Sequence, residues 1–161
     1  NVKETLIYLK RETAVWLEIT TLLIPGENDS SEEVDALTKW VAAELGPDVP
    51  LHFTAFHPDY KLLDRPATPP ATLARARQIG LRNGLRYVYT GNVHEEQGGS
   101  TFCPGCRKRV IGRDWFELTD WQLTDAGCCR GCGNRIAGVF NGPPGTWGAK
   151  RQPVRLGRRG G

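Results

Sequence analysis

The residues with the clearest chemistry are two pairs of cysteines, each with a Cys-x-x-Cys spacing. The first pair is Cys103 and Cys106, and the second pair, Cys129 and Cys132, follows after a gap of 22 residues. Each such turn offers two thiolates from one tight loop, and two turns complete the tetrahedral coordination of one ion. The spacing predicts a structural zinc ribbon, because four thiolates leave no open position at the ion for water or substrate.

Two other uses of these cysteines stay open at this stage. An iron site of the rubredoxin type takes the same four ligands, so the pattern alone does not choose between zinc and iron. Disulfides are less expected, because no export signal opens the chain and all five cysteines fall between residues 103 and 132. The fifth cysteine, Cys128, fits neither pair and is expected to be a spare thiol.

Upstream of the cysteines, the sequence predicts alternating helices and strands. Runs of apolar and β-branched residues predict strands at residues 15–24, 51–56 and 85–90. Apolar residues at helical spacing predict a helix before the first strand. A second helix is expected from the capping box of Ser30 and Glu33 to Gly46, and a third from Pro69 to Gly84.

This order of elements implies parallel strands joined by right-handed crossovers, and so an α/β fold. Three parallel strands make a poor free-standing domain, because both sheet faces need covering and both edges stay open. We therefore expect the last strand and helix units of a larger α/β sheet or barrel. The chain contains no Met and begins with Asn1, which favours an internal or C-terminal piece of a longer protein.

Composition and charge indicate more than one module. The 161 residues are 39% hydrophobic and 24% charged, which supports a packed core and argues against disorder throughout. No apolar stretch reaches the roughly 18 residues of a membrane span, so we expect no membrane partner and a cytoplasmic location. Residues 1–99 carry a net charge of −4, whereas residues 100–161 carry +7. We expect a boundary near residue 97, with the ribbon at 97–142 and a flexible joint at 97–100.

The remaining residues, 143–161, are expected to form a basic and disordered tail. Residues 148–161 hold five basic residues and no acid, a composition found both in nucleic-acid-binding tails and in solvated termini. No aromatic residue lies among the arginines to stack on bases, so nucleic acid is not the expected partner.

Further candidates lie where the predicted strands end, because ligands of parallel α/β sheets bind at the carboxyl ends of strands. His57 and Asp59 follow the second strand, and Asn92 follows the third. Each such residue can also serve only to cap its loop. His52 lies inside the second strand and is expected on a sheet face or in the core.

Four blocks in order resemble the C-terminal half of the AmmeMemoRadiSam system radical SAM proteins, which are similar to pyruvate formate-lyase activating enzymes. The blocks are residues 16–29, 52–60 and 87–93 and the two cysteine pairs. The resemblance implies a partial (β/α)6 barrel that binds S-adenosylmethionine beside a [4Fe-4S] cluster. It also implies that cleavage of S-adenosylmethionine yields a 5′-deoxyadenosyl radical, which abstracts a hydrogen atom.

The resemblance also suggests residues that contact the cofactor. In the activating-enzyme relatives, a histidine that closes the strand matching residues 51–56 lies near the adenosine. By this match, His57 is expected to contact S-adenosylmethionine. Asp59 and Asn92 fall in the matching blocks and are carried over as further cofactor-binding residues on the active-site face. A protein substrate or partner fits this family but is not identified by any residue here.

One departure from the family matters for activity. The family holds its cluster with an N-terminal C-x-x-x-C-x-x-C, and no such spacing occurs in this chain. The resemblance therefore implies that residues 1–96 form the late part of the barrel. It also implies that this chain is inactive by itself. The alternative is a non-enzymatic zinc-ribbon module that binds nucleic acid or a protein partner.

Overall fold

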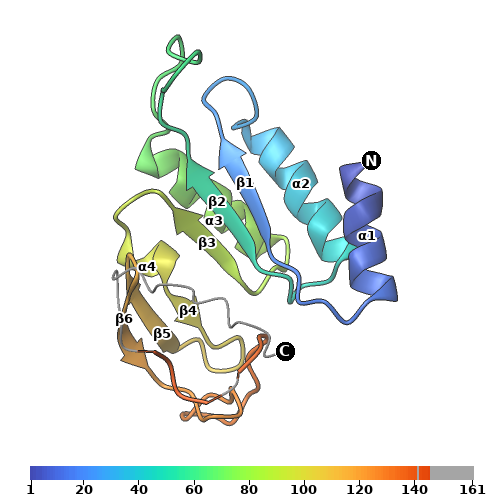
Figure 1. Ribbon diagram of the computed structural model, residues 1–161, viewed down its shortest axis with the longest axis vertical. Helices are drawn as coiled ribbons and strands as arrows, with labels where there is room; N and C mark the ends of the chain where they lie inside the picture. Colours follow the sequence, from blue (N-terminus) through green and yellow to red (C-terminus); the bar gives the residue numbers. More distant parts are fainter. Residues whose placement is uncertain (141, 146–161) are drawn as a thin grey trace, which may run out of the picture.

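The computed structural model describes residues 1–140 and 142–145, which form two three-stranded sheets of different kinds (Figure 1). The first sheet is parallel, in the order β1 (Ile19–Leu23), β2 (Leu51–Ala55) and β3 (Val88–Gly91). Three helices alternate with these strands: α1 (Val2–Glu12), α2 (Ser31–Glu44) and α3 (Pro70–Arg82). The α/β prediction is confirmed as a mixed fold with a parallel sheet; a closed barrel is not seen in the described residues.

The first strand is shorter than predicted. β1 begins at Ile19 and not at residue 15, because its neighbour β2 begins at Leu51, which lies directly opposite Ile19. Residues 15–18 therefore have no strand of this sheet beside them. The second strand is confirmed over Leu51–Ala55. The third begins at Val88, three residues later than predicted, and ends at Gly91.

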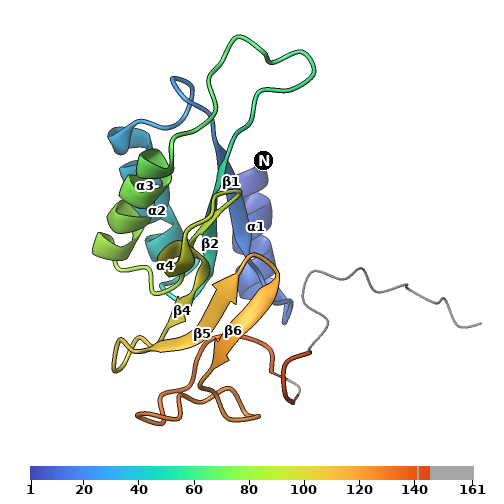
Figure 2. The same ribbon diagram turned by 90° about the vertical axis from the view of Figure 1, so that its left-hand side faces the viewer.

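The two faces of the parallel sheet differ in what covers them. Helices α2 and α3 cover one face (Figure 2). Helix α1 lies at the β1 end of the sheet (Figure 1), where Leu6 and Ile7 pack against the core and Arg11 pairs with Glu44 of α2. Along β2, Leu51, Phe53 and Ala55 are buried on the helix side, so His52 and Thr54 lie on the opposite face. We call that opposite side the open face; the register aligns Thr20, His52 and Tyr89 across it. The prediction that His52 lies on a sheet face is consistent with this pattern.

Helix α2 starts at the predicted cap. The Ser30 hydroxyl accepts a hydrogen bond from the Glu33 N–H at 3.2 Å. The Glu33 carboxylate accepts from the Ser30 hydroxyl at 2.8 Å and does not reach back to a backbone N–H as in a full capping box. Helix α3 is followed by Gly84 with φ of +93°, the left-handed residue expected after a helix end.

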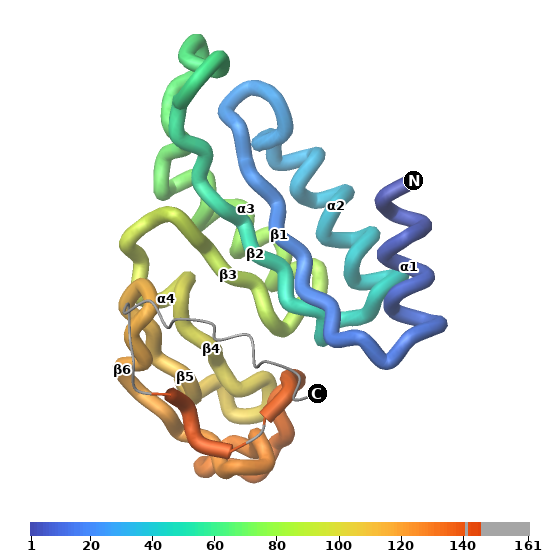
Figure 3. Tube along the Cα trace, in the orientation of Figure 1, coloured from blue at the N-terminus to red at the C-terminus, as the bar shows by residue number. Residues whose placement is uncertain are grey.

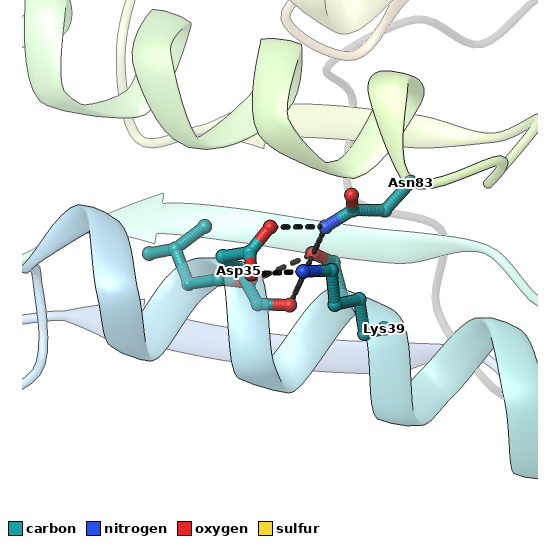
Figure 4. Close-up of polar contacts among 5 residues, drawn as sticks. Asp35, Lys39 and Asn83 are labelled. Atoms are coloured by element: carbon teal, nitrogen blue, oxygen red, sulfur yellow. Dashed lines mark hydrogen bonds and ion pairs between the residues drawn. The ribbon is translucent and has the colours of Figure 1, made fainter.

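Polar side chains join α2 to the end of α3 (Figure 4). The Asn83 amide nitrogen lies 2.9 Å from the Asp35 carboxylate and 2.8 Å from the Thr38 hydroxyl. Lys39 pairs with the other Asp35 oxygen at 2.7 Å. The hydrogen bond from Lys39, and then that from Asn83, lower the pKa of the Asp35 carboxyl below its usual value of 3.8.

The second sheet is antiparallel and belongs to residues 101–140, which we call the cysteine module. Its strands are β4 (Thr101–Phe102), β5 (Arg109–Asp114) and β6 (Glu117–Trp121). The chain trace passes from β3 through a short helix into β4, so the module lies against the β3 side of the parallel sheet (Figure 3).

The short helix α4 (Glu96–Gly99) occupies the segment that was predicted to be a flexible joint. That prediction is wrong, because Gly98 is buried where the helix meets β3. A Cβ atom at Gly98 would lie only 1.8 Å from the Thr90 hydroxyl oxygen, so the close approach requires glycine. The predicted basic tail at 143–161 lies outside the described residues except for 143–145. No helix among the described residues is long and apolar enough to span a membrane.

Candidate metal centre and the adjoining cavity

The two cysteine turns have the same backbone structure. In each turn the N–H of the first cysteine, Cys103 or Cys129, donates to the carbonyl five residues later at 2.9 Å. The carbonyl of that cysteine accepts from the N–H four residues later at 2.8 Å. Because both turns repeat this pattern, each presents its two thiols on one side of a closed loop.

The four paired cysteines come together, as the spacing predicts. The sulfur atoms of Cys103, Cys106, Cys129 and Cys132 all lie within 4.8 Å of one another. Two of these separations are 3.5 Å for Cys103–Cys132 and 3.8 Å for Cys106–Cys129, and all four cysteines are free thiols. Zinc–sulfur bonds of about 2.3 Å in a tetrahedron place the sulfurs roughly 3.8 Å apart. The group therefore fits one metal ion.

Cys128 stays outside this group, as predicted. Its backbone N–H donates to the Thr124 hydroxyl at 3.1 Å, and its sulfur does not belong to the metal-binding set.

Electrostatics favours a cation among the four sulfurs. Burial opposes the ionised form of Cys129, but backbone hydrogen bonds from Gly131 and Cys132 and a thiol hydrogen bond from Cys106 lower its pKa to about 7. At Cys132 a backbone hydrogen bond from Asn134 favours the thiolate, yet the neighbouring thiols and burial raise the pKa to about 12. Without a bound cation, the four sulfurs thus resist being ionised together.

The core of the cysteine module includes a residue that precedes the module in the chain. Tyr87, just before β3, is 3% exposed and packs with Cys103, Cys129 and Ile136. Its hydroxyl accepts a hydrogen bond from the Ala137 N–H at 3.1 Å. Burial raises the pKa of Tyr87, so the phenol keeps its proton. Ordering of the cysteine turns is therefore coupled to the start of β3.

A cavity of about 1030 Å³ lies between the open face of the parallel sheet and the cysteine module. The sheet contributes His52 and Tyr89 to its lining, and the module contributes Arg113, Trp115 and Trp121. A space of this size accommodates a small organic ligand.

Hydrogen bonds connect the two walls of this cavity. Glu18 accepts from the Trp16 indole at 2.8 Å and lies 2.9 Å from His52 Nε2. The His52 ring stacks on Tyr89, with ring centres 4.9 Å apart. The Tyr89 hydroxyl lies 2.9 Å from the Thr101 hydroxyl, which joins the open face to β4. Burial raises the pKa of Tyr89, so its phenol also keeps its proton.

The three candidate cofactor residues occupy different surroundings. His57 is exposed in the loop after β2, and Asp59 in the same loop accepts from the Tyr60 N–H at 2.7 Å. Asn92 follows β3 with φ of +59°, lines the cavity, and donates to the Ala55 carbonyl at 3.2 Å. The structure thus brings Asn92, and not His57 or Asp59, to the described cavity; their assignment to a cofactor stays a prediction.

Several cavity residues were not predicted. Glu18 lies in a predicted strand and Arg113 lies on β5, and neither carries a recognisable site motif. Pairing of β1 with β2 places Glu18 near His52, whereas packing of the cysteine module against the parallel sheet places Arg113 near Tyr89. Trp115 lies at the tip of the hairpin between β5 and β6, where its indole donates to His94 Nδ1 at 2.8 Å. Its φ of +51° is unusual for a bulky residue and was the feature that sequence alone could not reveal.

Comparison with known proteins gives one informative similarity. The uncharacterized protein MJ0808 of Methanocaldococcus jannaschii is 40% identical to this chain over 129 residues, which is 80% of this chain. The matched part spans 39% of the length of that protein. No family model and no solved structure matches the chain.

Proposed function

We propose that this chain is the C-terminal part of a cytoplasmic radical SAM enzyme, with a structural zinc ribbon appended to late units of a partial (β/α)6 barrel. In such an enzyme, S-adenosylmethionine is cleaved reductively at a [4Fe-4S] cluster, and the 5′-deoxyadenosyl radical removes a hydrogen atom from the substrate. The resemblance described above and the greater length of the relative support a longer parent protein.

The observation that carries the zinc part is the grouping of four sulfurs within 4.8 Å. All four positions of a tetrahedral ion are then occupied by protein, so the ion stabilises the fold and does not bind substrate. The same cysteines do not suit a [4Fe-4S] cluster, because its four irons would need the sulfurs farther apart. Since no other cysteine pair is available in the chain, the cluster belongs to another part of the parent.

The parallel sheet supports the barrel part of the proposal. Its strands follow in the order β1-β2-β3, helices cover one face, and the other face borders a cavity. This is the arrangement of consecutive units in a β/α barrel, where the uncovered face points inward. His57, Asp59 and Asn92 would hold S-adenosylmethionine at the carboxyl ends of β2 and β3, with His57 near the adenosine.

The alternative is a non-enzymatic zinc-ribbon module that binds a protein partner, or nucleic acid through phosphate contacts. Residues 101–140 hold six Lys or Arg residues and four Asp or Glu residues, a formal charge of +2. Four thiolates with one Zn²⁺ add −2, which leaves the loaded module without net positive charge. The positive charge of this alternative therefore comes from residues 148–161, which hold five basic residues, no acid and no aromatic residue to stack on bases. The resemblance, and not the charge, is the reason to favour the enzyme.

The test is cleavage of S-adenosylmethionine by the parent protein, purified without oxygen. The coding sequence upstream of Asn1 is first read for a C-x-x-x-C-x-x-C. With a reductant, we expect 5′-deoxyadenosine to form, and a His57→Ala variant to need more S-adenosylmethionine for the same rate. An Asp64→Ala variant, altered at an exposed position of the same loop and outside the cavity lining, is the control. A parent that holds a cluster yet forms no 5′-deoxyadenosine, or a frame that begins at Asn1, would contradict the proposal.

A further inference from the structure

Arg113 is a half-buried cation on the cavity wall with no anionic partner. Its Nη1 donates to the Thr101 hydroxyl at 2.9 Å and to the Gly99 carbonyl at 3.1 Å. Both acceptors are neutral, and the guanidinium also lies 5.7 Å from the centre of the Tyr89 ring. No carboxylate of residues 1–140 or 142–145 pairs with Arg113, and the other residues of the chain include no Asp or Glu.

The acids that line the same cavity are each engaged elsewhere. Their partners are His52 and Trp16 for Glu18, Thr90 for Glu95, Arg109 for Glu96, and His94 for Asp114. A guanidinium has five N–H donors, and its two neutral contacts fix the group while leaving donors available. The protein therefore holds Arg113 in position without neutralising it.

The groups around Arg113 suit a ligand with an acidic end and an apolar body. The Tyr89 hydroxyl lies beside the same Thr101 oxygen, and because it keeps its proton it can donate to an anion. The indoles of Trp16, Trp115 and Trp121 also line the cavity. These rings offer apolar surface for the remainder of the ligand.

We propose that Arg113 binds the carboxylate of an organic monoanion in this cavity, with Tyr89 as a second donor. This inference rests on the proposed function and names its substrate class: a molecule with a carboxylate joined to an apolar or aromatic part. The planar fork of arginine matches the two oxygens of a carboxylate.

The charge of the cavity favours a monoanion over a phosphate. One guanidinium is present, while four carboxylates belong to the lining. A dianion would be repelled by those acids and would be only half neutralised by Arg113. A single carboxylate balances the single cation.

The experiment uses the full zinc-loaded chain, labelled with ¹⁵N, and three related probes followed by NMR. The probes are 3-phenylpropionate, its neutral amide 3-phenylpropanamide, and phenyl phosphate. We expect the carboxylate to shift the indole N–H signals of Trp115 and Trp121 with a Kd in the millimolar range, as is typical of so small a ligand. The amide and the phosphate should bind about tenfold more weakly.

Substitutions then assign the effect to Arg113. Arg113→Gln removes the charge and should weaken binding of 3-phenylpropionate about tenfold or more. Arg113→Lys keeps the positive charge but loses the planar fork, so its affinity for 3-phenylpropionate should lie between those of the original chain and Arg113→Gln. This variant also keeps the test valid if Arg113→Gln does not fold. The matched control is Arg82→Gln, since Arg82 is exposed at the end of α3 on the covered side of the sheet. This control should bind like the original chain.

Several results would overturn the assignment. Equal binding of the amide and the carboxylate would show that the charge is not recognised, and tighter binding of phenyl phosphate would reject the monoanion. Binding of S-adenosylmethionine that depends on Arg113 would assign the guanidinium to the cofactor and not to the substrate. None of these measurements needs the cluster. Their outcome is therefore independent of whether the parent protein forms 5′-deoxyadenosine.

Discussion

Arg107 and Gly133 occupy the same position in the two cysteine turns, and both have a left-handed backbone, with φ of 61° and 75°. In each turn this residue directly follows the second cysteine and donates its N–H to the carbonyl of the first at 2.8 Å. The left-handed conformation costs a non-glycine residue about 1–2 kcal/mol, so the first turn carries strain that the second avoids.

This difference predicts opposite effects of two exchanges. Arg107→Gly should raise the free energy of unfolding of the zinc-loaded chain by up to about 1 kcal/mol, since glycine relieves the strain but loses more entropy on folding. Gly133→Arg should lower it by about 1–2 kcal/mol. Urea denaturation measures the free energy of unfolding of both variants. A Gly133→Arg chain as stable as the original would show that a non-glycine residue is not strained at this position.

Serine substitutions distinguish the ligands from the spare thiol. Cys129→Ser removes one of four ligands and should lower zinc affinity by orders of magnitude, with loss of folded signals from the module. Cys128→Ser is the adjacent control and should keep one ion per chain. Competition with a chelator, followed by absorbance, measures the affinities. Equal affinities in the two variants would show that the pairing of cysteines is wrong.

Gly98 should tolerate no side chain, whereas its neighbour should. Gly98→Ala places a Cβ against Thr90 and is expected to cost about 1–3 kcal/mol of stability. At Gly99 a Cβ would meet its nearest atom, the Arg113 carbonyl oxygen, at 3.8 Å, an ordinary contact. Gly99→Ala should therefore change the stability by less than about 0.5 kcal/mol. Thermal unfolding followed by circular dichroism compares the two variants.

The Asp35 contacts predict a change of stability with acid. Because hydrogen bonds from Lys39 and Asn83 lower the pKa of Asp35 in the folded chain, its contribution is complete above the unfolded value of 3.8. It is lost as the pH falls through the lower folded value. The stability difference between the original chain and Asp35→Asn should therefore be constant near neutral pH and shrink below pH 4.

The measurement is urea unfolding over a pH series at matched zinc content. Asp64→Asn, which removes an exposed negative charge, serves as the control and should leave the stability nearly unchanged. A difference for Asp35→Asn that grows on acidification would contradict the direction of the pKa shift.

Much of the fold could be predicted because its signals are local. The cap at Ser30, the left-handed glycine after α3 and the β-branched runs of the strands each depend on residues close in sequence. The two Cys-x-x-Cys turns are local in the same way, since each defines its own loop. The two turns form one site only in the tertiary structure, but their paired spacing already predicts that they come together.

The cavity could not be predicted, because its residues meet only through long-range packing. Glu18 and His52 are brought together by the parallel register of β1 and β2, and Thr101 reaches Tyr89 through the turn made by α4. The glycines at 97–100 suggested flexibility, yet at Gly98 the missing side chain allows close packing. Composition does not distinguish these two uses of glycine.

Native mass spectrometry of the purified chain, with elemental analysis of its metal, tests most directly whether the four cysteines bind one structural ion. We expect a single added ion, identified as zinc, with the loss of about four protons from the thiols. Removal of this ion should disorder the cysteine module and release Tyr87 from its core. A chain that folds fully without metal and shows four reactive thiols at Cys103, Cys106, Cys129 and Cys132 would contradict the account.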